Sequence, residues 1–392
     1  MILKRLIIHL KYLPKKNVRF FKMCSSQTEK SSNGKINLQS TEKNSNDFNK
    51  QDAPSECLEK KKTPKMMYLL NKKGAEQFAS IIVKELLKNN VPVLEMQPGF
   101  GFLTQLLLDA GVPEIYLYEQ KEKFIETLEA MSKKYSQRIH IRKYNLLQLH
   151  KIGFLDFIKD EDTLGKVFSG IELANDFNKP SFQIVGPMPN IQLPIFLTSL
   201  DPKISFKYEH VVLYVAILPS VSKVFDDIPG SNFHKPRNIY LRVRFKYKIL
   251  DAMSRKYFYP QPNCSSKKKK NKASYCRDDA DKVYVVKLES NHDEVNQKFT
   301  KADWYHFVHF LRMGMKNRRS RIIPTLEKWI PGCGPNLIHH NFNIYSTFSE
   351  LTSPELLNLF NIFRALPGYE SSSFMSILQS GMPNYSEIYT MN

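Results

Sequence analysis

Acidic side chains are scarce in this sequence, and long apolar runs are absent from it. The 392 residues include 38 Asp and Glu against 58 Lys and Arg, which gives a formal charge of +20. Such an excess favours a polyanionic partner, either nucleic acid or an anionic membrane surface, and says nothing about the fold. No stretch approaches the ~20 apolar residues that a transmembrane helix needs, so we expect no membrane-spanning segment.

Cysteine is also rare, which argues against a disulfide scaffold. The five cysteines are scattered, odd in number and without a C-x-x-C pair, as is typical of a reducing compartment. A metal site would have to combine distant residues whose spacings match no zinc signature, so we predict free thiols and no metal. Those residues are Cys264, Cys276, Cys333, His339 and His340.

The N-terminus has no acid before Glu29, and residues 1–23 carry seven Lys or Arg. Apolar residues at helical spacing within this acid-free basic segment are typical of a mitochondrial presequence, and a disordered basic tail is the alternative. Residues 24–62 are rich in Ser, Asn, Lys, Gln and Glu. Because they cannot bury enough apolar surface to offset their ordering entropy, we predict a disordered linker and a fold that starts near Thr63.

Apolar residues make up 42% of the chain, enough for a sizeable core, and the length suggests two domains. Helical and strand patterns then alternate with short turns between them. The predicted helices are 75–90, 101–111 and 121–135, and the predicted strands are 91–96, 114–120 and 138–145. This alternation indicates an α/β fold with a parallel sheet and helices on its faces. Ligands of such sheets bind beyond the carboxyl ends of the strands, where the strand order reverses.

A glycine-containing turn follows the first of these strands. Pro98, Gly99 and Gly101 leave the backbone open to a ligand, and Glu119 ends the next strand about twenty residues later. A carboxylate at that place can accept hydrogen bonds from both hydroxyls of a ribose, so the spacing predicts a nucleotide-cofactor site. A turn whose backbone conformation requires both glycines, with or without a ligand, explains the pattern equally well.

The string E-x-x-P-G-x-G-x-L-T at residues 95–104 resembles the small-subunit rRNA adenine dimethyltransferases, which use S-adenosylmethionine. Further segments resemble the motifs of that family in the same order. They are MMYLLN (66–71), KYNLLQL (143–149), VGPMPN (185–190), YFYPQPN (257–263) and residues 304–326. With the N-terminal segment, the sequence is most similar to the mitochondrial branch that is dedicated to transcription, the B-type mitochondrial transcription factors.

The resemblance implies a Rossmann-like, S-adenosylmethionine-dependent methyltransferase domain over residues 63–292, with a basic insertion at 264–281. A smaller C-terminal helical domain and tail follow at 293–392, and a capping pattern at Ser353 predicts a helix over 350–366. The cofactor residues that the resemblance implies are Leu70, Glu95, Gly99, Gly101, Glu119 and Asn145.

The same resemblance predicts that side chains needed for methyl transfer are replaced at the reaction centre. Family enzymes hold the adenine amine with an Asn side chain and a backbone carbonyl, and stack an aromatic ring on the flipped base. Here Pro187 stands at the Asn position and Asn190 at the aromatic position, with Met188 and Pro189 between them. In the first motif, Met66 and Met67 replace a Gln and an Asn. No catalytic residue of this motif is intact, so we expect little or no methyl transfer to adenine.

Three basic segments favour nucleic-acid binding, with a solvated charged surface as the alternative. Residues 237–250 alternate between apolar and basic, which predicts a strand with one cationic face. Residues 264–277 form a lysine-rich insertion, and 315–321 joins two predicted helices. The candidate residues are Arg242, Arg244, Lys246, Lys267, Lys268, Lys269, Lys270, Lys316, Arg318, Arg319 and Arg321.

These observations lead to a functional expectation. The resemblance implies a monomeric initiation factor of the mitochondrial matrix and nucleoid that helps the mitochondrial RNA polymerase to open promoter DNA. Its other expected partners are the DNA-packaging transcription factor of mitochondria and rRNA. The alternatives are a mitochondrial small-subunit rRNA adenine N6-dimethyltransferase and a general RNA-binding protein of ribosome assembly.

Overall fold

The computed structural model describes residues 66–135, 137–159, 162–171, 179–188, 192–201, 210–260, 277–293 and 298–380. The predicted presequence, the linker, the insertion lysines Lys267 to Lys270 and the tail from residue 381 lie outside the described residues. Pro189 and Asn190 also lie outside them.

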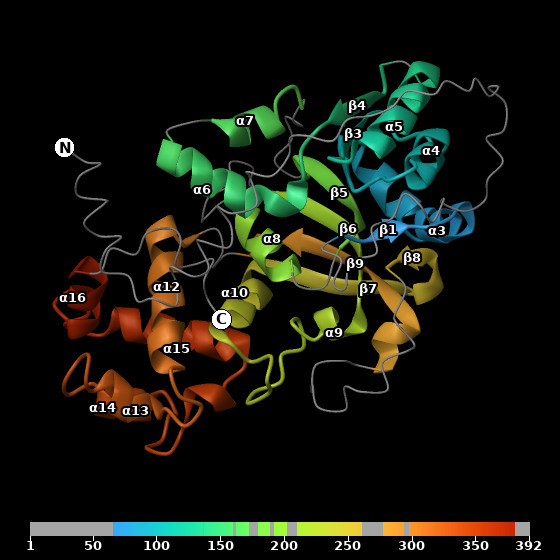
Figure 1. Cartoon of the computed structure of the whole chain (residues 1–392). Helices are drawn as coiled ribbons and strands as arrows, with labels where there is room; N and C mark the ends of the chain where they lie inside the picture. Colours follow the sequence, from blue (N-terminus) through green and yellow to red (C-terminus); the bar gives the residue numbers. More distant parts are fainter. Residues whose placement is uncertain are drawn as a thin grey trace, which may run out of the picture. The chain divides into compact units, whose positions relative to one another are not determined.

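The centre of the fold is a seven-stranded sheet in the order β4-β3-β2-β5-β6-β9-β7 (Figure 1). Its strands are β2 (Val93–Met96), β3 (Ile115–Tyr118), β4 (Ile139–Arg142), β5 (Phe182–Pro187), β6 (Val211–Ile217), β7 (Phe245–Ser254) and β9 (Lys282–Ser290). The four pairs from β4 to β6 are parallel, and β9 runs antiparallel to both of its neighbours. The order reverses between β2 and β5, which places the candidate ligand site at their carboxyl ends.

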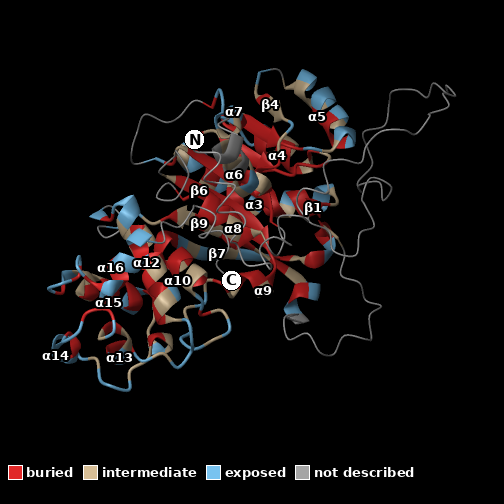
Figure 2. Ribbon diagram, turned by 60° about the vertical axis from the view of Figure 1, so that its left-hand side comes forward, coloured by how far each residue is buried: buried red, intermediate tan, exposed pale blue. Residues whose placement is uncertain are grey.

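Every residue of β2, β3, β5 and β6 is buried, as their continuous apolar runs lead one to expect of strands covered on both faces. Figure 2 shows this buried sheet between helices whose exposed residues face outward. On one face lie α3 (Lys72–Asn89), α4 (Phe102–Asp109) and α5 (Glu122–Lys134). On the other lie α6 (Leu149–Lys159), α7 (Thr163–Val167), α8 (Leu193–Ser199), α9 (Pro219–Ser222) and α10 (Pro236–Arg244). The short helix η2 (Leu146–Gln148) leads directly into α6.

Local signals set the ends of these helices. The Asn71 side chain accepts a hydrogen bond from Gly74 N at the start of α3, and Asn90 ends that helix in the left-handed conformation. The alternation predicted between residues 75 and 145 is therefore confirmed. A separate two-stranded sheet pairs β1 (Tyr68–Leu69) with β8 (Phe258–Tyr259), which brings the first family motif against the loop that follows η3 (Arg255–Tyr257).

The prediction of a strand over 237–250 is wrong in its first half. Residues 236–244 form α10, and the strand β7 begins only at Phe245. Pro236 stands at the first helical turn, where its fixed φ favours a helix. The buried run Asn238–Leu241 has no strand-like alternation, because the helix is covered on most sides. The alternation of apolar and basic residues did not exclude a helix here, since apolar residues also occur at helical spacing.

The C-terminal part is helical, as predicted. It comprises α12 (Lys301–Gly314), α13 (Ile322–Leu326), α14 (Gly334–His339), η5 (Phe348–Glu350), α15 (Ser353–Ala365) and α16 (Ser373–Ser380). Before this part of the chain, the short helix η4 (Arg277–Ala280) precedes β9. Its core is aromatic, with Phe310 within 6.5 Å, ring centroid to centroid, of five other aromatic rings. Helices α12 and α15 pack on α10, so one hydrophobic core continues across the predicted boundary at residue 293.

The cap of α15 differs from the prediction. Thr352, and not Ser353, is the N-cap residue, and its side chain forms a capping box with Glu355. Ser353 is buried instead, and its backbone N and Oγ both donate to the Asp227 carboxylate at 2.8 Å.

No helix in the part of the chain that the structure describes is long and apolar enough to cross a membrane. Nor do the described residues bring three His, Cys, Asp or Glu side chains together as a metal site. Cys333 is a buried free thiol, and burial raises its pKa to about 11.

Candidate functional site

The turn after β2 has the backbone that the glycines predicted. Gly99 and Gly101 have φ of 58° and 76°, in the left-handed region that favours glycine. A Cβ on Gly99 would lie 3.2 Å from the Tyr68 ring, and one on Gly101 would lie 2.6 Å from Met131 Cε. The positive φ angles, together with the tight contact at Gly99, favour both glycines within the protein itself, and they do not by themselves show that a ligand binds.

Glu119 follows β3 at the carboxyl edge of the sheet and is 1% exposed. Its Oε1 accepts hydrogen bonds from Gln120 N at 2.9 Å and Lys121 N at 3.0 Å, and the Tyr68 hydroxyl lies 3.4 Å away. Burial raises the pKa of this carboxyl, against the opposing effect of the backbone of Lys121, Gln120 and Gly99 and of the Lys121 charge. Oε2 is buried and has no hydrogen-bond partner among the described residues. An orphaned acceptor at this place fits a ribose hydroxyl of S-adenosylmethionine.

Glu95, the first acid of the family motif, serves the fold. Thr104 Oγ1 donates to its Oε2 at 2.7 Å, and burial raises the pKa of Glu95 to about 8. A carboxyl with that pKa is mostly protonated at neutral pH. Glu95 therefore ties β2 to α4 from inside the core.

Leu70 and Asn145, the remaining predicted cofactor residues, lie near Met66. Leu70 and Met66 pack against the buried rings of Tyr68 and Phe124. Asn145 Oδ1 accepts from Leu147 N at 3.0 Å, and its Nδ2 lies 3.6 Å from Met66 Sδ. The amide that could have met the adenine of the cofactor is thus already bonded as the N-cap of η2.

S-adenosylmethionine therefore fits this corner of the fold in part. Glu119 would hold the ribose, and the turn at Gly99 brings the backbone close to it. Met66 offers no hydrogen-bond donor, and the Asn145 side chain is used locally. When bound, the cofactor supplies an electrophilic methyl group on its sulfonium.

The motif at residues 185–190, which corresponds to the reaction centre of the family enzymes, is described up to Met188, and this part of it belongs to the core. Gly186 is packed so closely that a Cβ would lie 2.5 Å from Met96 O. Pro187 ends β5 opposite Ala216, and Met188 is fully buried, with its N donating to Ala216 O at 2.9 Å. Pro187 has no side-chain group that can accept a hydrogen bond from an amine.

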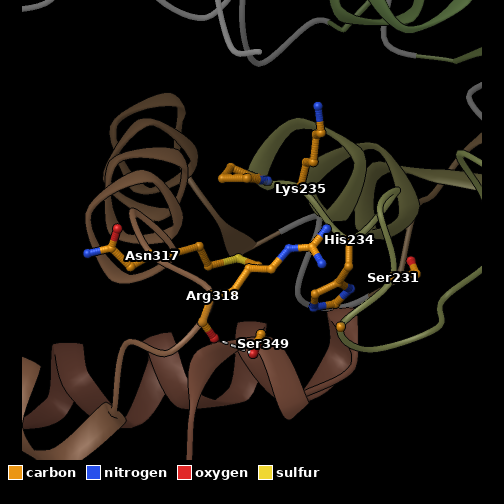
Figure 3. Close-up of a pocket in the computed structure, with 9 residues that line it drawn as sticks. Ser231, His234, Lys235, Asn317, Arg318 and Ser349 are labelled. Carbon is orange, nitrogen blue, oxygen red and sulfur yellow. Dashed lines mark hydrogen bonds between the residues drawn. The ribbon is translucent and has the colours of Figure 1, made fainter. Parts of the chain in front are cut away.

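A second site lies between α10 and the C-terminal helices. A pocket of about 170 Å³ opens where the loop before α10 meets the loop after α12 (Figure 3). The Arg318 side chain reaches toward the 230–236 loop, where its Nη2 donates to Asn232 Oδ1 at 2.7 Å. The lining residues are Gly230, Ser231, His234, Lys235, Pro236, Met315, Asn317, Arg318 and Ser349.

The structure supports only some of the predicted nucleic-acid residues as surface cations. Lys316, Arg318, Arg319 and Arg321 are all exposed on one loop, and Lys246 is exposed on the edge strand β7. Lys235, which sequence reasoning missed, is exposed at the pocket and precedes the first turn of α10. The Lys-Pro step at residues 235–236 was the available signal, and it lies just before the strand predicted over 237–250.

The structure corrects the prediction of a cationic surface at Arg242 and Arg244, because both guanidinium groups bind partners inside the protein. Arg244 is 4% exposed and donates from Nε and Nη2 to the two oxygens of Asp201, each at 2.8 Å. Arg242 donates to Val224 O, Phe233 O and Asp227 Oδ1 and so shapes the loop under the pocket. Neither is carried into the candidate nucleic-acid interface.

Comparison with known proteins decides the family. The model of the family described as ribosomal RNA adenine dimethylase matches residues 58–365, well over half of the chain. The chain belongs to the ribosomal RNA adenine dimethylase family. The match spans the sheet, the Glu119 corner, the reaction motif and the basic loop at 315–321.

The similar proteins are distant in sequence. A protein of Drosophila melanogaster named dimethyladenosine transferase 2, mitochondrial, is 24% identical over 384 residues, which cover 84% of this chain and 83% of the fly protein. Among solved structures, the 23S rRNA methyltransferase ErmE is 15% identical, with a TM-score of 0.48 over 76% of this chain and 99% of its own. A dimethyladenosine transferase from Plasmodium falciparum is 14% identical, with a TM-score of 0.46 over 74% of this chain and 96% of its own.

Proposed function

We propose that this protein is a mitochondrial transcription initiation factor built on a methyltransferase scaffold. It assists the mitochondrial RNA polymerase by binding the separated strands of promoter DNA. The observation that carries the proposal is Pro187, which stands at the end of β5 where the family has the Asn that holds the adenine amine.

The chemistry of adenine methylation makes this substitution costly. The N6 lone pair is delocalised into the purine ring, so an enzyme must position and polarise the amine before it attacks a methyl group. Pro187 offers neither an acceptor side chain nor a backbone N–H, and Met188 is sealed in the core. A strand-binding role needs none of this chemistry.

The basic loop supplies what strand binding requires. Opening duplex DNA costs on the order of 1.4 kcal/mol of stacking per base-pair step. Phosphate contacts can offset that cost, and Lys316, Arg318, Arg319 and Arg321 present four exposed cations beside a pocket that Lys235 also lines.

The mitochondrial name of the fly relative supports a mitochondrial location, and we place the protein in the matrix, at the nucleoid. The proposed partners are the mitochondrial RNA polymerase, promoter DNA and the DNA-packaging transcription factor, with rRNA as a second nucleic-acid ligand. S-adenosylmethionine bound at Glu119 would be a retained ligand in this role.

A second candidate function is mitochondrial rRNA adenine N6-dimethylation. Two observations favour it: the name of the fly relative, and the orphaned Glu119 Oε2 that fits the cofactor's ribose. It requires the adenine amine to be held by groups other than the side chain at position 187.

Run-off transcription with purified polymerase separates the candidates. An initiation factor is required on a linear duplex promoter and dispensable on the same promoter with a pre-melted start site. In parallel, the protein is incubated with labelled S-adenosylmethionine and the small-subunit rRNA hairpin. Stoichiometric dimethyladenosine that is lost in Glu119→Ala, together with no effect on transcription, would establish the enzyme and reject the initiation factor.

A further inference from the structure

An exposed tyrosine lies next to the basic loop, and the proposed function does not yet use it. Tyr345 is 69% exposed, the largest fraction for any big apolar or aromatic side chain among the described residues. Its backbone is well held, because Asn343 Oδ1 accepts hydrogen bonds from Tyr345 N at 2.8 Å and Ser346 N at 2.9 Å. The ring is therefore presented to solvent from an ordered turn.

The segment that carries Tyr345 is bonded along the basic loop. Ile322 N donates to Ser346 O at 2.9 Å, and Phe348 N donates to Ser320 O at 3.1 Å. At the far end, Ser349 Oγ donates to Arg318 O at 2.7 Å, which is the dashed line in Figure 3. Residues 316–321 and 343–349 thus form one surface, here named the basic ledge, with the pocket at one end and Tyr345 at the other.

A cation already lies over one face of the tyrosine ring. The Arg321 guanidinium carbon is 5.6 Å from the centroid of the Tyr345 ring, within the range of a cation–π contact. This contact favours one orientation of the ring and leaves most of its surface exposed. Aromatic rings beside a cationic groove bind single strands because every base has a π face that can stack on them.

The geometry points to a base-stacking site: Tyr345 stacks on an unpaired base of a single-stranded nucleic acid whose phosphates bind the basic ledge and the pocket at Arg318. This inference rests on the proposed function and names the ligand class of the same surface. Duplex DNA fits less well, because the faces of its bases are covered by their neighbours.

A protein partner is the alternative ligand for this surface, since Tyr345 and its neighbour Ile344, which is 51% exposed, could both pack against an apolar surface. The basic ledge favours a polyanionic ligand over a protein, because four of its side chains are exposed cations and one of them lies over the Tyr345 ring. These cations are Lys316, Arg318, Arg319 and Arg321, the last of which contacts the ring. An apolar protein surface would have to desolvate these cations without replacing their solvation.

The test measures the binding of the full chain to a fluorescent single strand and to the matched duplex, by anisotropy at fixed salt. Tyr345→Ala removes the ring, and Tyr345→Phe keeps it. Leu87→Ala, at an exposed apolar site on α3, is the matched surface control. Arg319→Gln probes the charge of the ledge separately. A single strand carrying 2-aminopurine reports stacking directly, since its fluorescence falls when the base stacks.

We expect Tyr345→Ala to weaken single-strand binding about fivefold or more, while duplex binding changes less than twofold. Tyr345→Phe and Leu87→Ala should bind like the wild type, and 2-aminopurine should be quenched by the wild type but not by Tyr345→Ala. Unchanged binding and quenching in Tyr345→Ala, with weaker binding in Arg319→Gln, would overturn the stacking site and leave strand binding intact. No single-strand binding by the wild type would overturn both, and would favour the protein partner.

Discussion

The Tyr68 hydroxyl lies 3.4 Å from Oε1 of Glu119, the carboxylate predicted to bind the ribose of the cofactor. Tyr68 is fully buried, packs in a tilted arrangement against Phe124 with ring centroids 5.1 Å apart, and lies under the Lys121 ammonium at 4.9 Å. The Tyr68 hydroxyl therefore competes with a ribose for the same carboxylate, although it approaches Oε1 and leaves Oε2 without a partner in the described part of the chain.

Tyr68→Phe should strengthen the binding of S-adenosylmethionine. The variant removes one of the three donors at Glu119 Oε1 and keeps the ring that packs on Gly99. We expect the dissociation constant from titration calorimetry to fall by about threefold to tenfold, in keeping with a hydrogen bond worth about 1 kcal/mol. Glu119→Ala should abolish binding. An unchanged or higher dissociation constant in Tyr68→Phe would show that the hydroxyl does not compete with the cofactor.

Glu95 should make the protein less stable as the pH rises. Its folded-state pKa of about 8 exceeds the ordinary value of 4.5, so between these values the folded state holds a proton that the unfolded state has lost. The free energy of unfolding should therefore fall by up to about 1.4 kcal/mol per pH unit between pH 5 and 8. Urea unfolding at several pH values measures this slope. Glu95→Gln, which stays neutral, should flatten the slope; an equal slope in the variant would exclude Glu95 as its source.

The buried pair of Asp201 and Arg244 should be important for stability. Tyr240 also donates to Asp201, at 2.6 Å, and the Arg244 guanidinium lies 4.9 Å from the Trp304 ring of α12. Asp201→Asn leaves a buried guanidinium without its counter-charge and should cost about 3–5 kcal/mol in urea unfolding.

A matched exposed pair provides the control for that measurement. Lys143 Nζ lies 3.4 Å from Glu122 Oε2, with both side chains mostly exposed. Glu122→Gln should cost less than about 1 kcal/mol. Because the two members of the buried pair interact, Asp201→Asn combined with Arg244→Met should destabilise less than the sum of the single variants. Additivity would mean that the two groups do not stabilise each other.

Arg319 should contribute to nucleic-acid binding through charge alone. If it contacts a phosphate, Arg319→Gln lowers the slope of log K against log salt concentration for a single strand by about 0.7, whatever the sequence of the strand. Lys246→Gln, on the far sheet edge, tests whether that exposed cation belongs to the same interface. Equal salt slopes in the wild type and Arg319→Gln would remove Arg319 from the interface.

Local patterns were enough to predict much of this protein. The alternating elements between residues 75 and 145 follow from side-chain periodicity and from signals such as Gly111, because these act over one or two turns of chain. The prediction that Pro187 cannot hold an adenine amine combines the family resemblance with residue type, since no fold gives a proline side chain an acceptor.

Other properties depended on residues that are far apart in the chain. Arg244 reads as a surface cation until Asp201, 43 residues earlier, is placed against it in the core. Glu95 and Asn145 have the residue types of a cofactor site, yet their hydrogen bonds to Thr104 and Leu147 use them within the fold. The ledge that joins Tyr345 to Arg321 likewise forms only when two distant loops pair. Burial and partner choice are set by the packing of the whole chain, so only the tertiary structure separates a charge in the core from one that can meet a ligand.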